Sequence, residues 1–169
     1  DRPGAGVSGN SFAWINATAK NPASYHGFNR RSMEMWARFV RELEVDVGLR
    51  WGGQLKWESS EDGATALANR VGQLQGWGYP CRMVGDSELR RLEPGLVPGP
   101  VTAAALSEAD GHVDPRRAID ACLLRAGEAG ATVHADTPVT SLNQTQVSDG
   151  RTRIESVGTE NGEHPCDVV

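Results

Sequence analysis

The run from Ser8 to Asn16 places small, hydroxylated and aromatic side chains next to one another, as ligand-binding turns do. Its sequence is Ser8-Gly9-Asn10-Ser11-Phe12-Ala13-Trp14-Ile15-Asn16. Where side chains are small, backbone N–H groups can approach an anionic or dipolar ligand without obstruction by a Cβ atom. The same composition is typical of a glycine- and serine-rich surface loop with one buried tryptophan, and these residues alone favour that simpler interpretation.

A second segment with chemically active side chains is Asp110-Gly111-His112-Val113-Asp114-Pro115. Asp-Gly is typical of a turn, and Asp114 before Pro115 is typical of a helix N-cap followed by the first helical residue. His112 and Asp114 lie two residues apart, as metal ligands or an acid–base pair can, but no third ligand accompanies them. We therefore predict no metal site, assign the segment a mainly architectural role, and identify no catalytic residue.

Composition and charge argue against several classes of function. The chain has 169 residues and a formal net charge of -5 without a basic run, so nucleic acid is not an expected partner. Its three cysteines are odd in number and form no C-x-x-C pair, which favours a reducing, cytoplasmic location. No apolar run approaches the roughly 20 residues that a membrane-spanning helix needs. The polar start of the chain does not resemble a signal peptide.

Hydrophobic periodicity predicts a mixed α/β chain that begins in a loop. Helices are expected over 22–48, 60–76, 86–92 and 115–130. Strands are expected over 49–57, 81–84, 101–107, 132–135, 139–147, 151–159 and 164–169, with hairpin turns at Asp149-Gly150 and Asn161-Gly162. The first helix should bury Tyr25, Phe28, Met35, Trp36, Phe39, Val40 and Leu43, and the last should bury Ile119, Cys122, Leu123 and Ala126. Ser59 followed by Asp62 resembles a capping box for the second helix.

Three segments together resemble the middle of FAD-dependent amine or amino-acid oxidoreductases of the D-amino-acid oxidase type. They are Ser8 to Ala17, Gly53-Gln54-Leu55 and Asp110 to Pro115. The group includes glycine oxidase, sarcosine oxidase and dimethylglycine dehydrogenase. No glycine-rich dinucleotide fingerprint opens a strand-to-helix turn in this sequence, so we interpret it as an interior segment of a larger flavoenzyme.

The resemblance implies an α/β fold in which part of an FAD-binding nucleotide-binding domain is interrupted by part of an antiparallel-sheet substrate domain. Residues 1–48 and 114–169 would belong to the FAD-binding domain, and residues 49–113 to the substrate domain. It also implies roles for individual residues: Ser8, Gly9, Asn10, Ser11, Phe12 and Ala13 as FAD contacts, Val139 as a backbone contact to the adenine, and Trp14 as a wall of the substrate pocket. Relatives that attach flavin covalently place a histidine in or beside the first segment. None occurs between Ser8 and Asn16, so we expect non-covalent FAD.

In such enzymes a hydride equivalent passes from the carbon beside an amine to the flavin, and the protein supplies mainly orientation and desolvation. The expected partner is therefore a small-molecule amine or amino acid. The chain alone is expected neither to bind FAD tightly nor to turn over, since the rest of the enzyme would complete it. Two alternatives stay open: a binding or interaction module that has lost its nucleotide site, and one chain of a split flavoenzyme completed by a partner subunit.

Overall fold

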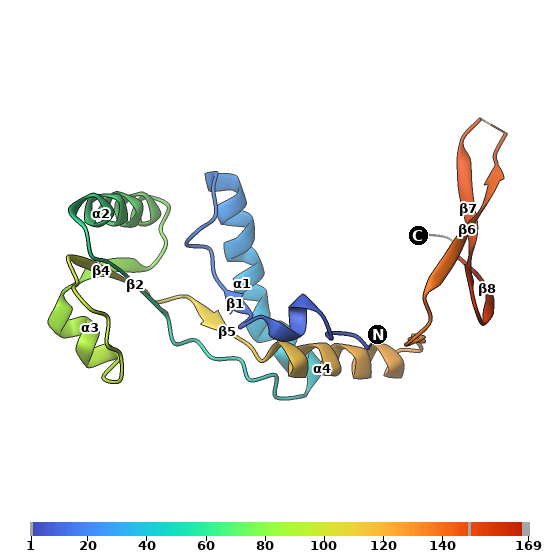
Figure 1. Ribbon diagram of the computed structural model, residues 1–169, viewed down its shortest axis with the longest axis horizontal. Helices are drawn as coiled ribbons and strands as arrows, with labels where there is room; N and C mark the ends of the chain where they lie inside the picture. Colours follow the sequence, from blue (N-terminus) through green and yellow to red (C-terminus); the bar gives the residue numbers. More distant parts are fainter. Residues whose placement is uncertain (1, 149, 167–169) are drawn as a thin grey trace.

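The computed structural model describes residues 2–148 and 150–166, and its elements are spread along one long axis (Figure 1). A three-stranded sheet with helices α2 and α3 lies at one end, α1 and a two-stranded pair lie in the middle, and α4 leads to a second three-stranded sheet at the other end (Figure 1). Every strand pair in the described chain is antiparallel. The expected mixture of helices and antiparallel sheets is confirmed.

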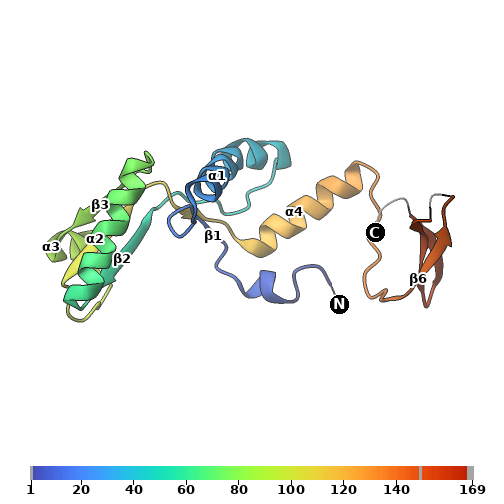
Figure 2. The same ribbon diagram turned by 90° about the horizontal axis from the view of Figure 1, so that it is seen from above.

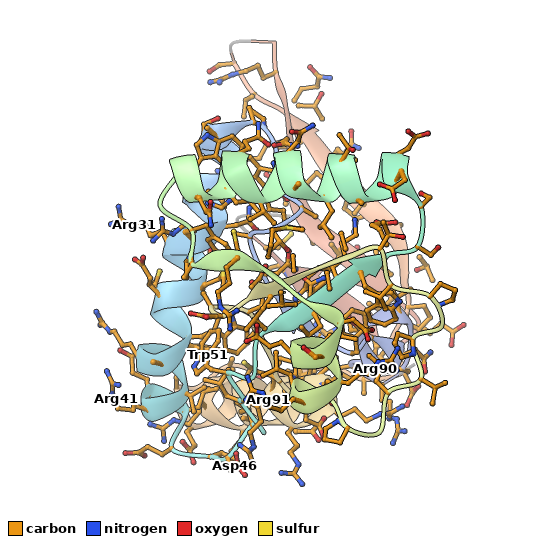
Figure 3. The ribbon with its side chains drawn as sticks, turned by 90° about the vertical axis from the view of Figure 1, so that its left-hand side faces the viewer. Arg31, Arg41, Asp46, Trp51, Arg90 and Arg91 are labelled. Atoms are coloured by element: carbon orange, nitrogen blue, oxygen red, sulfur yellow. The ribbon has the colours of Figure 1, made fainter. Side chains whose placement is uncertain are left out.

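Helix α1 (Ala23–Leu43) packs through a face that only partly matches the predicted one. Its buried residues are His26, Met33 and Leu43, and Trp36 and Val40 are partly buried against the same core. Four residues that we expected to be buried are exposed: Tyr25, Phe28, Met35 and Phe39. Figure 3 shows Arg31 and Arg41 pointing outward from α1 and Trp51 between α1 and α3. The prediction was correct for Leu43 and, in part, for Trp36 and Val40, and it was wrong for the four exposed residues, because two apolar faces compete on this helix and tertiary packing selects between them.

The first large sheet has the order β2-β4-β3, with β2 (Gln54–Glu58), β3 (Cys81–Val84) and β4 (Ala103–Ser107). Alternate residues of the strands face α2 and α3 on opposite sides. Helix α2 (Glu61–Gly76) contributes Leu67, Val71 and Leu74 to the core. Helix α3 (Asp86–Leu92) buries Leu89 in a smaller cluster on the other side.

The start of α2 corrects one detail of the prediction. Ser60, not Ser59, is the N-cap, and its hydroxyl oxygen accepts a hydrogen bond from the backbone N–H of Gly63 at 3.1 Å. Such a bond satisfies one of the N–H groups that a helix start leaves without an internal partner.

Helix α4 (Pro115–Glu128) begins where the sequence predicts. The carboxylate of Asp114 accepts hydrogen bonds from the backbone N–H groups of Arg116 and Arg117, at 2.9 and 3.1 Å. Its packing differs from the prediction, because Ala121 is the buried residue and Cys122 is exposed. A short 3₁₀ helix, η1 (Val7–Asn10), lies beside α4, where the backbone at Gly4 approaches Ile119.

The second sheet is a meander of β6 (Val139–Gln146), β7 (Thr152–Thr159) and β8 (Gly162–Pro165), and it lies beyond the end of α4 (Figure 2). The hairpin at Asn161-Gly162 is confirmed by the pairing of Thr159 with Gly162. Residues 132–135, predicted as a strand, are irregular. The other predicted turn includes Asp149, and the last predicted strand includes 167–169; these residues lie outside the described part of the chain.

Two arginine side chains link α1 to α2. Arg30 of α1 donates to the carbonyl oxygens of Trp77 and Gly78 at 3.2 and 3.1 Å, just past the end of α2. Arg70 of α2 donates to the carbonyl oxygens of Thr18 and Lys20 at 2.9 and 3.2 Å, in the loop before α1. The predicted segments 1–48 and 49–113 are therefore joined by reciprocal hydrogen bonds.

None of the described helices combines the length and the apolar character that a membrane span needs. Over residues 2–148 and 150–166, no three His, Cys, Asp or Glu side chains gather as a metal site would require.

Candidate functional site

A cavity of about 420 Å³ lies where the three sequence segments meet. Phe12 and Trp14 come from the first segment, Gly53 and Gln54 from the second, and Gly111 and His112 from the third. The segments are far apart in the sequence, so the fold alone brings these residues to one place. This cavity is the candidate functional site.

Backbone pairing holds the walls of the cavity in register. Strand β1 (Trp14–Ile15) pairs with β5 (Gly111–His112), which sets Trp14 opposite His112. On its other side His112 exchanges two backbone hydrogen bonds with Arg50, at 2.9 and 3.0 Å. The backbone N–H of Gly53 donates to the carbonyl oxygen of Asp110 at 2.9 Å. The first two walls are therefore each bonded directly to the third.

Two glycines in these walls are required by close backbone approach. A Cβ atom on Gly111 would lie 2.5 Å from the carbonyl oxygen of Arg50, and one on Gly53 would lie 3.0 Å from that of Ser107. Gly53 also has φ +79°, a left-handed conformation that glycine adopts at little cost. The two glycines therefore allow close approach of the backbone. The polar side chains that line the cavity are those of Gln54 and His112.

The aromatic wall consists of Phe12 and Trp14. Their ring centroids are 6.1 Å apart with an interplanar angle of 26°, a stacked arrangement. Phe12 is 73% exposed, whereas Trp14 is partly buried and its indole N–H donates to Asp110 Oδ2 at 3.1 Å. The pair offers a flat apolar surface whose inner ring is fixed by a hydrogen bond.

Behind this wall lies a buried polar network centred on Asp110. The hydroxyls of Tyr79 and Thr18 also face its carboxylate, and the Tyr79 oxygen accepts from the backbone N–H of Ala17 at 3.3 Å. Burial raises the pKa of the Asp110 carboxyl, while the hydrogen bonds from Tyr79, Trp14 and Thr18 act in the opposite direction. Burial and the neighbouring carboxylate raise the pKa of Tyr79 well above its ordinary value, so its hydroxyl stays protonated and acts as a donor.

A second cavity, of about 360 Å³, shares Trp14 and Gln54 with the first. It lies between α2 and the sheet, with Leu67 and Val71 on the helix and Ala105 and Ser107 on β4 among its lining residues. Trp14 and Gln54 therefore separate two neighbouring spaces.

The predicted site residues are only partly brought together. Phe12 and Trp14 line the main cavity, but Ser8, Gly9 and Asn10 lie in η1 next to α4. Val139 begins β6 at the far end of the molecule, where its side chain is 57% exposed and its backbone pairs with Thr159 (Figure 1).

Sequence reasoning assigned no site role to Gln54, His112, Asp110 or Tyr79. The motif containing Gln54 was noticed, but nothing in its spacing shows which way the side chain points. Asp110 was explained by turn chemistry, and its burial depends on contacts with residues more than 30 positions away.

The donor set of the first segment fits a flavin dinucleotide. Ser8, Asn10 and Ser11 are exposed and carry hydroxyl and amide groups that can hydrogen-bond to phosphate and ribose oxygens, whereas Ile15, later in the same segment, is buried in the core. Phe12 and Trp14 line the cavity with two stacked aromatic rings, an apolar surface of the kind that a planar ring system can contact.

Comparison with known proteins gives a consistent result. The family model described as "DAO: FAD dependent oxidoreductase" matches residues 1–169. Glycine oxidase from Geobacillus kaustophilus has a similar structure, with a TM-score of 0.83 and 23% identity over 98% of this chain and 45% of its own. For L-proline dehydrogenase from P. horikoshii the TM-score is 0.81, with 21% identity over 98% of this chain and 42% of its own.

A more distant similarity involves a structure with FAD bound, L-alpha-glycerophosphate oxidase from Mycoplasma pneumoniae. Its TM-score is 0.71, with 19% identity over 94% of this chain and 41% of its own. At these identities the structures show a shared fold, and the chain spans less than half the length of each of these proteins. No curated protein sequence matches the chain.

Proposed function

Because the chain belongs to the family of FAD-dependent oxidoreductases, we propose that the protein containing it oxidises the C–N bond of an amino acid or of a secondary or tertiary amine. The observation that carries the proposal is the convergence of three separate segments on one cavity with an aromatic wall. The names of the similar structures support an amine, because two of them are glycine oxidase and L-proline dehydrogenase.

We also propose which residues hold the cofactor. Ser8, Gly9, Asn10, Ser11, Phe12 and Ala13 would contact FAD, and the backbone of Val139 would contact its adenine. FAD is an extended molecule, so contacts at two separated places are compatible with one bound dinucleotide. The binding is non-covalent in this proposal, since the run from Ser8 to Asn16 has no histidine.

Bound FAD supplies the electron sink that accepts a hydride equivalent from the substrate. The residues of this chain position the substrate and exclude water from it. Trp14 and Phe12 form an apolar wall that excludes water from one side of the substrate. Gln54 and His112 are the polar side chains that can orient it, by a hydrogen bond from an amide or an imidazole.

We also propose a cytoplasmic location for the protein. Cys81, Cys122 and Cys166 are free, which agrees with a reducing, cytoplasmic location. The chain alone is proposed to be inactive, because relatives with this fold are more than twice as long.

The test is to purify the whole protein and record its visible spectrum, then mix it anaerobically with glycine, sarcosine, L-proline or glycerol 3-phosphate. We expect a flavin spectrum that bleaches with at least one of the amines. If glycerol 3-phosphate alone bleaches the flavin, the substrate is an alcohol and the proposed amine is wrong. A flavin-free protein that does not bind FAD would support the binding module. Flavin that appears only when a second chain co-purifies would support the split enzyme.

A further inference from the structure

We propose that Asp110 is a positioning residue of the cavity: its buried carboxylate fixes the indole ring of Trp14, and its backbone fixes the two walls that face this ring. The inference rests on the proposed function, because it assigns a role in holding the substrate to a residue outside the cavity. Asp110 does not line the cavity and is not proposed to touch substrate or cofactor.

Three walls of the cavity meet at Asp110. Its Oδ2 atom accepts the indole N–H of Trp14 at 3.1 Å. Its carbonyl oxygen accepts the backbone N–H of Gly53 at 2.9 Å. Its peptide bond leads directly to Gly111, which lies in the third wall. A displacement of Asp110 would therefore move all three walls together.

Asp110 is itself held in place by burial and by hydrogen bonds. It is 0% exposed, and Tyr79, which donates to Oδ1, is 3% exposed. Thr18 Oγ1 lies 3.4 Å from Oδ2, and Ala17 donates its backbone N–H to the Tyr79 oxygen. One short stretch of chain contains Trp14, Ala17 and Thr18. Hydrogen bonds attach this stretch at three points to Asp110 and Tyr79, which belong to the segment 49–113.

Burying the carboxylate of Asp110 costs free energy of folding. A buried carboxylate is unfavourable unless donors surround it. Among the described residues Asp110 has hydrogen-bond donors but no ion-pair partner, and each donor side chain is uncharged. An amide or an apolar residue would fill the same turn without this cost. The carboxylate is explained if a strong acceptor is needed to hold an indole ring in one orientation.

The experiment uses the whole flavoprotein with Asp110→Asn, Trp14→Phe and the double variant. Trp14→Phe keeps a flat ring but removes the N–H donor. The matched control is Glu108→Gln, which removes an exposed carboxylate two residues away that pairs with Arg82. The first readout is independent of activity: the indole ¹⁵N–¹H signal of Trp14, identified by its loss in Trp14→Phe. We expect this signal to move and to lose exchange protection in Asp110→Asn and to stay unchanged in Glu108→Gln.

The second readout is steady-state kinetics with the amine that reduces the flavin. We expect Asp110→Asn to raise KM about tenfold with a smaller change in kcat, and Trp14→Phe to do the same. In the Trp14→Phe background, Asp110→Asn should change KM by less than about twofold, since the bond it acts through is already absent. Fully additive effects of the two changes, or an unmoved indole signal in Asp110→Asn, would overturn the proposal.

If Asp110→Asn does not fold, Trp14→Phe and Tyr79→Phe keep the proposal testable. Tyr79→Phe removes one donor to the carboxylate and leaves the ring, so the Trp14 signal should shift and KM should rise less than in Trp14→Phe. An unchanged KM in Trp14→Phe would refute the positioning role. Failure of the proposed function has a different signature, because the flavin would then not bleach with any amine while the indole signal still reports on Asp110.

Discussion

Replacing Gly111 by alanine should destabilise the protein by forcing apart the strands that form the cavity. The added Cβ atom would lie 2.5 Å from the carbonyl oxygen of Arg50 and 2.5 Å from Cε3 of Trp51. The Trp51 side chain is 45% exposed and can rotate away, but the Arg50 oxygen belongs to the backbone. That oxygen also accepts the N–H of His112 at 3.0 Å, so relief of the clash stretches a hydrogen bond.

The magnitude follows from these two contributions. Overpacking of this kind costs about 1–3 kcal/mol, and weakening one backbone hydrogen bond costs about 0.5–1.5 kcal/mol. We therefore expect Gly111→Ala to lower the free energy of unfolding by about 2–4 kcal/mol. The assay is urea denaturation of the whole protein followed by circular dichroism, with the midpoint and the slope fitted together.

Gly72→Ala is the matched control, because an added Cβ at Gly72 in α2 meets no atom within 4 Å. Alanine is favoured over glycine inside a helix by about 0.5–1 kcal/mol, so this variant should be slightly more stable than the wild type. The two glycine-to-alanine changes thus have opposite predicted signs. Equal midpoints for Gly111→Ala and the wild type would refute the argument that close approach requires glycine in β5.

Three further predictions concern stability. Ser60→Ala should cost about 1 kcal/mol by removing the cap of α2, whereas Ser59→Ala should change the urea midpoint little. Arg70→Lys should cost about 1–3 kcal/mol, because a lysine has one nitrogen in place of the guanidinium fork whose Nε and Nη2 bind the carbonyl oxygens of Thr18 and Lys20, while Arg31→Lys on the exposed face of α1 should be neutral in the same assay. The third is a pH dependence: the folded-state pKa of Asp110 is raised, so the folded protein binds this proton more tightly than the unfolded chain does. The contribution of Asp110 to stability should therefore fall as pH rises from the ordinary aspartate range through the raised pKa, and Asp110→Asn should remove this slope from a plot of urea midpoint against pH.

Local chemistry explains which parts of the fold could be predicted from the sequence. The start of α4 was predicted because Asp114 and Pro115 act on residues immediately beside them. The buried face of α1 was predicted only in part, because Phe28 and Met35 are as apolar as Met33 and only the packing partners decide which of them is buried. Residues 132–135 alternate as a strand does, but in the described structure no strand pairs with them.

The candidate site was predictable to a smaller extent. Trp14 was predicted as a pocket wall from a resemblance, and its place in the cavity agrees with that role; its contact with substrate stays a prediction. Contacts of Ser8 to Ala13 and Val139 with FAD also stay predictions. The network of Asp110 and Tyr79 could not be foreseen, because its members are 31 residues apart and neither spacing nor residue type marks them as neighbours.

The two arginine links between α1 and α2 bear on which parts of the structure can move to open the cavity. Each helix holds carbonyl groups of the other's flanking chain, so the links resist both separation and sliding. Rocking of one helix against the other would break these hydrogen bonds, whereas a side-chain rotation in the cavity wall would not. The side chain of Phe12, 73% exposed at the rim, has little packing to lose on rotation. Rotation of the Phe12 ring alone can therefore widen the cavity on this side without movement of α1 or α2.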